Sequence, residues 1–552
     1  MTKNFLSGVR PDTVFRNGKI LTVDADNTVA QAVGIFGNQF CSVGDEAAVL
    51  AAAGPETKVI DLRGKTVIPG IIDSHNHIYS AGTLMEGIML FGIDTIDGVK
   101  QVIADKVREV APGEWIIGGG WIESQFKEYR MPNRWDLDEV APDNPVVLHR
   151  LFATSVCNSK ALELAGVDKN TRPKRGTMDT DPATGEPTGI FSNGAQILIT
   201  SHIPQGDIED LNALMERRIK LAMNEYVRWG ITSVIDPGVS VPLMRAYHNV
   251  YQKGELPLRV NMMPEAYGLA AISSDICDPA GTEGILDYIG IHSPFGDNWL
   301  SIGALKFAMD GGIGSKTAMM NGPWVDGTVS DIPLRLDLDV MSDLFFRSHR
   351  LGWSIGIHTC GDRAQDIALA AFVKAIAAHP RDDVRHNIIH GYLPTKSALE
   401  IMRDNNIAVS VQPGFMYVEG DIYWDALREE QIHYFKPLRT YLDYGIKVAA
   451  NSDMTSAHYD PFFGMYATVA RKTSQGRSLG DAEKISREEM LRLFTINGAY
   501  LTFEDTIKGS IEVGKLADMA VLSDDIMTVP EEKIKDLTIE KTVIDGNIVY
   551  QK

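Results

Sequence analysis

The sequence predicts an α/β fold: a (β/α)8 TIM barrel, with a small β-sandwich domain built from both termini and an insertion at the barrel mouth. Three observations support this prediction. Through the middle of the chain, short apolar runs rich in β-branched residues alternate with helical runs, as in a parallel sheet. We count eight such apolar runs, which is the strand number of this barrel. Both ends of the chain instead contain short strands separated by turn residues.

The two ends are expected to form one composite domain, from residues 1–68 and 503–552. Near the N-terminus, Asn17-Gly18 lies between two β-prone runs, which is a strong hairpin signal. Near the C-terminus, Asp545-Gly546-Asn547 indicates another hairpin. Neither end has enough strands for a sandwich, so we expect the two to combine. Further strands are expected at 32–36, 40–43, 58–62, 509–522 and 541–550.

Residues 69–502 are expected to form the barrel. Counting the run that leads into it, the expected strands are 67–72, 230–236, 258–263, 302–310, 354–358, 387–390, 407–412 and 446–453. Amphipathic spacing predicts helices between them at 208–227, 337–351 and 364–379.

One segment, about 113–198, interrupts this alternation and is rich in Pro, Gly, Trp and Asp. It is too long for a βα connection, so we expect an insertion at the catalytic rim of the barrel. Trp115, Trp121 and Trp135 could line an apolar pocket there, and Trp121 is the candidate substrate contact. The alternative is that the tryptophans form the core of the insertion, which we favour for at least two of them.

The composition narrows the class of protein. The 552 residues carry a formal net charge of −20 and no long basic run, so neither nucleic acid nor an anionic membrane surface is an expected partner. No secretion leader and no membrane-length apolar run is evident, and a soluble cytoplasmic protein is expected. The four cysteines (Cys41, Cys157, Cys277 and Cys360) are far apart without a CxxC pair, so neither a disulfide framework nor a cysteine-based zinc site is expected.

The first barrel strand ends in His75-Asn76-His77. Residues i and i+2 of a strand point to the same side, so both imidazoles can reach one point in space. Neutral imidazole is a common ligand for zinc and related ions. The motif therefore indicates a metal site; the alternative is two unrelated polar residues at a strand terminus.

In a barrel, side chains at the carboxyl ends of the strands converge on one face. The strand ends carry His75, His77, Lys306, His358, His390 and Asp453. Singly, each has an ordinary explanation: His358 or His390 could be a core histidine, and Asp453 could cap the next helix. Four of the thirteen histidines fall at such positions, which is improbable by chance, and together the six favour metal binding.

Lys306 is flanked by Leu305 and Phe307, where an ammonium ion would be costly to bury. Either its amine reaches solvent at the barrel mouth, or it has reacted with CO2. The product would be a carbamate, an anionic oxygen ligand that can bridge two cations.

The ligand set and several motifs along nearly the whole chain resemble the amidohydrolase superfamily of metal-dependent hydrolases. More narrowly, they resemble its amidohydrolase-3 or YtcJ-like branch, which includes N-substituted formamide deformylase. The motifs lie at 17–24, 67–77, 185–189, 306–315, 358–364, 452–453, 495–499 and 509–518. At 190–193 and 153–157 the chain departs from many relatives. Both departures lie in the insertion, so they bear on substrate recognition rather than on metal binding.

The resemblance implies that His75, His77 and Asp453 hold one metal ion, that carboxylated Lys306 bridges, and that His358 and His390 hold a second. It implies hydrolysis of a linear non-peptide amide C–N bond, for example in an N-substituted formamide, with Asp453 as general base and then acid. Zinc is the expected ion, as one or two ions, with Mn or Fe as alternatives. A homodimer acting on a small molecule is expected.

Two other functions stay open. The same site could hydrolyse an ester, lactone or carbamate, or deaminate its substrate. The chain could also be a catalytically silent scaffold or regulatory protein, although such a protein would have no chemical reason to retain all six ligands.

Overall fold

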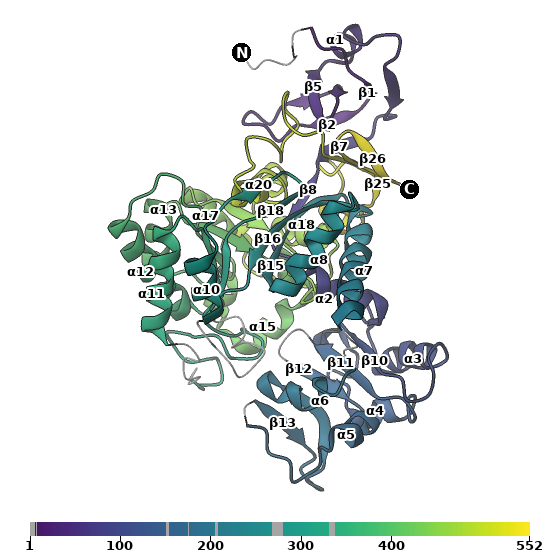
Figure 1. The fold of residues 1–552 in the computed structure, drawn as a ribbon, viewed down its shortest axis with the longest axis vertical. Helices are drawn as coiled ribbons and strands as arrows, with labels where there is room; N and C mark the ends of the chain where they lie inside the picture. Colours follow the sequence, from purple (N-terminus) through teal and green to yellow (C-terminus); the bar gives the residue numbers. More distant parts are fainter. Residues whose placement is uncertain are drawn as a thin grey trace.

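The computed structural model describes residues 6, 8–150, 154–174, 176–204, 208–267, 280–329 and 337–552. Three parts follow one another along its long axis (Figure 1): strands of both termini at one end, the central α/β part in the middle, and the insertion at the other end. Of the cysteines considered above, Cys41, Cys157 and Cys360 are free, and Cys277 lies outside the described residues. Within the described chain, none of the helices combines the length and apolarity needed to cross a membrane.

Two sheets lie at one end of the structure, and the second combines strands from both termini. The first has the order β5-β4-β1-β6, with β5 (Gln39–Gly44), β4 (Ala32–Phe36), β1 (Thr13–Arg16) and β6 (Lys58–Asp61). The second has the order β26-β25-β24-β7-β2-β3, with β26 (Asn547–Gln551), β25 (Ile539–Ile544), β24 (Met519–Leu522), β7 (Thr66–Pro69), β2 (Lys19–Leu21) and β3 (Val29–Ala30). One buried apolar cluster joins them, with Phe15 and Phe40 from the first sheet and Val67 and Val521 from the second.

The hairpin predicted at Asn17-Gly18 is wrong. β1 pairs with β4 and β6, whereas β2 pairs with β3 and β7, so the turn carries the chain from one sheet to the other. Asn17 has a φ of 55°, the left-handed conformation that Asn-Gly also adopts in hairpin turns, but here it lies in a link between two sheets. The hairpin predicted at Asp545-Gly546 is confirmed, because β25 and β26 pair antiparallel with Ile544 opposite Asn547.

The predicted first barrel strand is two strands, β7 in the terminal sheet and β8 (Ile71–Asp73) in the central part. The break falls at Gly70, whose backbone lies against Thr232. A Cβ on Gly70 would be 2.2 Å from the Thr232 hydroxyl oxygen, so only glycine allows this approach. One apolar run of the sequence therefore contributes both to the core of the terminal sheets and to the core of the central part.

The predicted α/β fold is confirmed, although regular pairing among the described strands does not close into one ring. The central strands form two five-stranded sheets, β17-β18-β16-β15-β8 and β19-β20-β21-β22-β23. Their bounds are β15 (Ile231–Val239), β16 (Arg259–Pro264), β17 (Phe295–Gly296), β18 (Leu300–Ile302), β19 (Leu305–Ala308), β20 (Ile355–Thr359), β21 (Asn387–His390), β22 (Ala408–Val411) and β23 (Val448–Ala450). An isolated bridge between Glu265 and Lys306 joins the sheets on one side, and the Ser74 N–H donates to the Ala450 carbonyl on the other.

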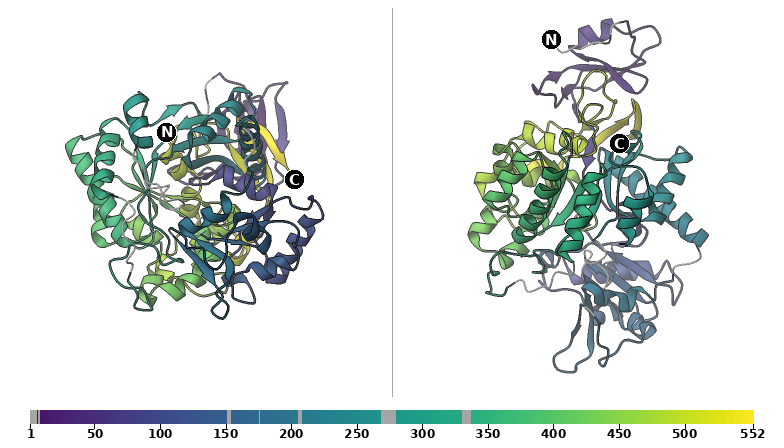
Figure 2. Two further views of the ribbon diagram at one scale, coloured as in Figure 1. Left: turned by 60° about the horizontal axis from the view of Figure 1, so that its bottom comes forward. Right: turned by 60° about the vertical axis from the view of Figure 1, so that its left-hand side comes forward.

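Helices surround these strands (Figure 2, left). They include α2 (Ile78–Glu86), α7 (Ile208–Val227), α8 (Val241–Gln252), α10 (Ala280–Tyr288), α11 (Leu338–Arg350), α12 (Asp362–Ala378), α13 (Lys396–Asp404), α17 (Leu438–Asp443), α18 (Pro461–Ala470), α19 (Arg487–Leu493) and α20 (Ile496–Leu501). The three predicted helices correspond to α7, α11 and α12, with ends that differ by at most two residues.

The insertion has its own sheet, in the order β13-β14-β12-β11-β10-β9. Its elements are β9 (Ile88–Met89), α3 (Ile96–Val107), β10 (Ile116–Gly119), α4 (Arg134–Asp138), β11 (Val146–Arg150), β12 (Thr154–Cys157), α5 (Ser159–Ala165), β13 (Thr177–Thr180) and β14 (Pro187–Ser192). The sheet of the insertion thus begins at β9, before residue 113, where the sequence predicted that the insertion starts. The ring of Phe91, which follows β9, lies 5.5 Å from that of His458, which follows β23. This contact places the insertion beside the carboxyl ends of the central strands.

A buried ion-pair cluster fastens the central part to the terminal strands. Arg259 is 1% exposed, and its guanidinium donates to both carboxylate oxygens of Asp518, at 2.7 and 2.9 Å. The same guanidinium also donates to Asp545, in the turn between β25 and β26. Bidentate pairing of this kind fixes orientation as well as distance.

Candidate metal centre

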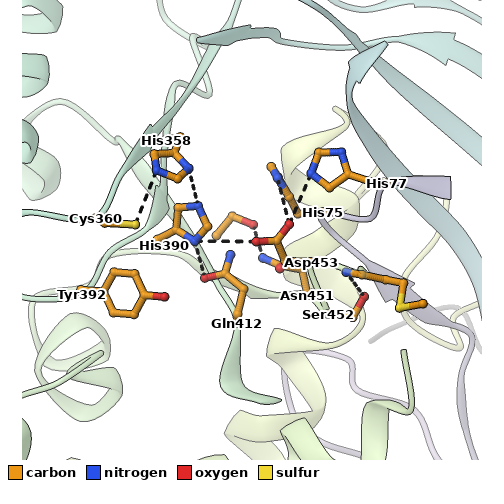
Figure 3. A network of polar contacts seen from close by, with 12 residues as sticks. His75, His77, His358, Cys360, His390, Tyr392, Gln412, Asn451, Ser452 and Asp453 are labelled. Atoms are coloured by element: carbon orange, nitrogen blue, oxygen red, sulfur yellow. Dashed lines mark hydrogen bonds and ion pairs between the residues drawn. The ribbon is translucent and has the colours of Figure 1, made fainter. Parts of the chain in front are cut away.

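The six residues predicted at strand ends lie together. His75 and His77 follow β8, Lys306 lies in β19, His358 and His390 lie in β20 and β21, and Asp453 follows β23. Five of them face one another around a common space (Figure 3). The sixth, Lys306, has its Nζ 3.3 Å from His75 Nε2. Convergence of the strand ends, rather than proximity in sequence, brings them together.

The first group of donors consists of His75, His77 and Asp453. Asp453 Oδ1 lies 3.4 Å from His77 Nε2 and 3.8 Å from His75 Nε2. Two ligands of a tetrahedral zinc ion, each bonded at about 2.0–2.2 Å, lie about 3.4 Å apart. The separations in the structure therefore fit a shared ion, and two imidazoles with one carboxylate are a donor set that suits zinc.

Hydrogen bonds between the segments at the ends of β8 and β23 hold Asp453 in place. The Asp453 N–H donates to the His75 carbonyl at 2.9 Å, and Asp453 has a φ of 49°, unusual for a residue other than glycine. Next to it, the Asp73 carboxylate accepts the Ser452 hydroxyl at 2.6 Å and the Asn76 amide at 2.9 Å. The helix-cap alternative for Asp453 does not hold, because the side chain of Asp460 caps α18.

The second group contains His358 and His390, whose tautomers follow from their neighbours. His358 Nε2–H donates to the Gly311 carbonyl at 2.9 Å. His390 Nδ1–H donates to Gln412 Oε1 at 2.8 Å. The orientation of the Gln412 amide is fixed because Lys436 Nζ donates to the same oxygen at 2.8 Å.

These assignments leave a lone pair on His358 Nδ1 and another on His390 Nε2. The two nitrogens are 2.8 Å apart, so in the neutral rings two acceptors face each other. Burial lowers the pKa of His358 to about 4 and that of His390 well below its usual value, which disfavours a proton between them. A cation satisfies both lone pairs, and the second group therefore also fits a metal ion.

Lys306 is 2% exposed, and its charge acts on His75 of the first group and on His358 and His390 of the second. Burial lowers the pKa of its amine to about 7, although the nearby Asp453 carboxylate acts in the opposite direction. At neutral pH a large fraction of this amine is therefore unprotonated, which is the form that reacts with CO2.

Three residues near the centre were missed by the sequence prediction: Cys360, Gln412 and Lys436. Cys360 belongs with His358 and His390 to a group whose ligand atoms lie within 4.8 Å of one another. The spacing His358-x-Cys360 repeats the i, i+2 spacing of His75 and His77 and could have revealed it. Gln412 and Lys436 act through contacts distant in sequence and carry no comparable local signal.

Trp121 lies in the buried core of the insertion and is 1% exposed. This burial agrees with the core alternative and argues against contact with a substrate. Trp135 is 40% exposed, with the Arg134 guanidinium 4.9 Å from its ring centroid. Trp115 packs against another buried apolar cluster of the insertion, which includes Leu162 and Phe191.

Comparison with known proteins identifies relatives over the full chain. The sequence profile of the amidohydrolase family matches residues 58–550. N-substituted formamide deformylase of Arthrobacter pascens is 30% identical, with 98% of each chain covered. The Bacillus subtilis (strain 168) protein YtcJ is 28% identical, over 90% of this chain and 91% of its own. Among solved structures, an uncharacterized metal-dependent hydrolase of Pyrococcus horikoshii has a TM-score of 0.73 at 23% identity, covering 94% of this chain and 99% of its own.

Proposed function

The chain belongs to the amidohydrolase family, and from this premise we propose that it is a metal-dependent hydrolase of a linear, non-peptide amide C–N bond. The observation that carries the proposal is the pair of donor groups that meet at Asp453, one with facing imidazole lone pairs. The substrate class is supported by the relative from Arthrobacter pascens, so an N-substituted formamide is the first candidate.

His75, His77 and Asp453 would hold one divalent ion, and His358 with His390 a second. Zinc suits these ligands best, and Mn or Fe would also fit. When bound, such an ion supplies a Lewis acid that polarises a carbonyl group and lowers the pKa of coordinated water from 15.7 to about 7.

Asp453 is the proposed general base and acid. Its carboxylate is 5% exposed, with Oδ1 toward His77 and Oδ2 4.0 Å from His390 Nδ1, so it lies between the two donor groups. It would accept a proton from the attacking water and return it to the leaving nitrogen. The backbone bond to His75 and the Asp73–Ser452 contacts hold the carboxylate where this transfer occurs.

We propose that Lys306 carries a carbamate. Its amine nitrogen would form a bond to the carbon of CO2 and lose one proton, which leaves an anionic oxygen pair in place of the amine. Nζ lies 3.3 Å from His75 Nε2, and its charge also acts on His358 and His390, which supports a role between the two donor groups.

We also propose four features that the sequence predicts for this protein. They are the division into a composite domain (1–68 and 503–552) and a (β/α)8 barrel (69–502), a homodimer, a cytoplasmic location, and the exclusion of nucleic acid and membrane as partners.

Elemental analysis combined with a panel of N-acyl amines tests the function. The purified protein should contain one or two equivalents of zinc and should hydrolyse N-substituted formamides faster than the matching acetamides. His77→Ala should lose metal and activity together, whereas His202→Ala, which changes an exposed histidine just after the insertion, should lose neither. A protein that contains no metal and takes up no added zinc would instead support the scaffold function. Activity confined to esters or lactones would keep the metal centre and overturn the amide substrate.

A further inference from the structure

Glu419 is a buried carboxylate that the proposed mechanism does not use. It lies between α14 (Pro413–Val418) and α15 (Gly420–Ala426) and is 6% exposed. Glu419 Oε2 accepts a hydrogen bond from the Tyr423 hydroxyl, whereas Oε1 has no hydrogen-bond partner in the part of the chain that the structure describes. An unmet buried acceptor lowers stability, so a group that donates to Oε1 would be bound favourably.

A short series of aromatic contacts joins Glu419 to the second donor group. The ring of Tyr392 lies parallel to the His390 imidazole, with 5.8 Å between the centroids and 6° between the planes. The Tyr392 hydroxyl lies 3.4 Å from that of Tyr423, which in turn donates to Glu419. Both tyrosines are at most 3% exposed. Two buried tyrosine side chains therefore separate Glu419 from a proposed metal ligand.

The insertion approaches Glu419 from the other side. The helix that follows this residue, α15, lies between the central part and the insertion (Figure 1). Burial raises the pKa of the Glu419 carboxyl, and the nearby guanidinium of Arg150, the last residue of β11, lowers it. Arg150 also donates through Nε to Glu123 of the insertion, at 2.6 Å. Glu419 thus lies where the insertion meets the central part, which is where a substrate would enter the centre.

We propose that Glu419 is a specificity-determining residue, whose Oε1 accepts a hydrogen bond from a hydroxyl or amino group at the end of the substrate remote from the scissile amide. The inference rests on the proposed function, because it places the reacting carbonyl at the metal centre. A carboxylate oxygen accepts but does not donate, so it selects against a remote end that is an ether or a carboxylate. The competing account, fastening, is that Glu419 only ties α15 to Tyr423 and to the insertion.

Matched formamides test this selectivity on the zinc-loaded protein. One series carries a terminal hydroxyl on alkyl linkers of increasing length, a second replaces the hydroxyl with a methoxy group, and a third ends in a methyl group. At the linker length that suits the site, kcat/KM should be about 10- to 100-fold higher for the hydroxyl compound than for the other two. Equal values at every length would overturn the inference and leave the hydrolase proposal intact. A protein that hydrolyses none of the compounds would overturn both.

Glu419→Gln separates recognition from fastening. The amide oxygen can keep the Tyr423 hydroxyl as its donor, and the amide NH2 then takes the place of Oε1. The preference should therefore invert, so that the methoxy compound has the higher kcat/KM. Glu429→Gln changes an exposed carboxylate at the start of α16 (Glu429–His433), and this control should keep the wild-type preference. A Glu419→Gln protein that keeps the wild-type preference, with or without a loss of thermal stability, would support fastening and overturn the inference.

Calorimetry measures the same selectivity without turnover. The amino alcohol released from the best hydroxyl compound should bind to the wild type and to Glu429→Gln alike, and about 10-fold or more weakly to Glu419→Gln. Equal dissociation constants for the three proteins would refute the role of Glu419.

Discussion

Gln412 should control the metal affinity of the second donor group through the tautomer of His390. Its Oε1 accepts from His390 Nδ1 and from Lys436 Nζ, each at 2.8 Å, and this pairing leaves the lone pair on His390 Nε2. Gln412→Leu removes the acceptor, so the proton can move to Nε2 and occupy the ligand position. Lys436 retains the His390 carbonyl at 3.1 Å and the face of Tyr392 at 3.8 Å, so the loss falls mainly on the imidazole.

Loss of such an outer hydrogen-bond partner costs about 10- to 100-fold in metal affinity, or about 1.4–2.7 kcal/mol. Competition with a chromophoric chelator measures the dissociation constant of the more weakly bound zinc ion directly. Gln412→Glu keeps an acceptor toward both donors and should retain the affinity to within a few fold. Gln196→Leu, which removes a buried amide of the insertion that accepts from Ser155, is the matched control and should have no effect on zinc. If Gln412→Leu binds zinc as tightly as the wild type, the tautomer argument is wrong.

Three further predictions concern catalysis, cohesion and pH. Asp453→Asn should lower kcat at saturating zinc by about 10²- to 10⁴-fold while the circular dichroism spectrum stays unchanged, and undiminished turnover would refute the acid–base role. Arg259→Met should lower the free energy of unfolding by about 3–5 kcal/mol in urea titrations, because two carboxylates lose a buried partner. Arg228→Met, which removes an exposed ion pair, should lower it by less than about 1 kcal/mol. Equal effects would contradict a stabilising role for the buried Arg259 cluster. Burial lowers the pKa of His386 and of His349 in the folded state. Below about pH 6.5 the unfolded state therefore binds more protons than the folded state, so the contribution of these two histidines to the free energy of unfolding is complete above that pH and is lost as the pH falls below it. The urea midpoint of His386→Gln should fall less than that of the wild type between pH 7 and pH 5, and identical slopes would contradict this origin.

The positions of the ligands could be predicted from the sequence because the signal is local. An apolar strand run that stops at His, Lys or Asp marks a strand end, and parallel strands bring such ends together whatever lies between them. This reasoning found His75, His358 and Asp453, which are far from one another in the sequence. It missed Cys360 because only cysteine pairs were considered, although the spacing to His358 was visible.

Other features could not be predicted because they depend on packing between distant segments. Asn17-Gly18 has the composition of a hairpin, but the sheet that each flanking strand joins is decided by its tertiary partners. The split of the run at Gly70 depends on the approach of Thr232, which no local pattern reveals. The orientation of Gln412 likewise depends on Lys436, and the burial of Trp121 on strands of the insertion as far away as β12.

The pairing of β7 with β24, in which Val67 lies opposite Val521, has a consequence for biosynthesis. During synthesis, His75 and His77 are made early, whereas Asp453 follows hundreds of codons later. β24 is made later still, and it pairs with β7, the strand that leads to those two histidines. The nascent chain therefore carries these two histidines without Asp453 for most of its synthesis. The proposed metal ion could be bound in its final geometry only when nearly the whole polypeptide has emerged.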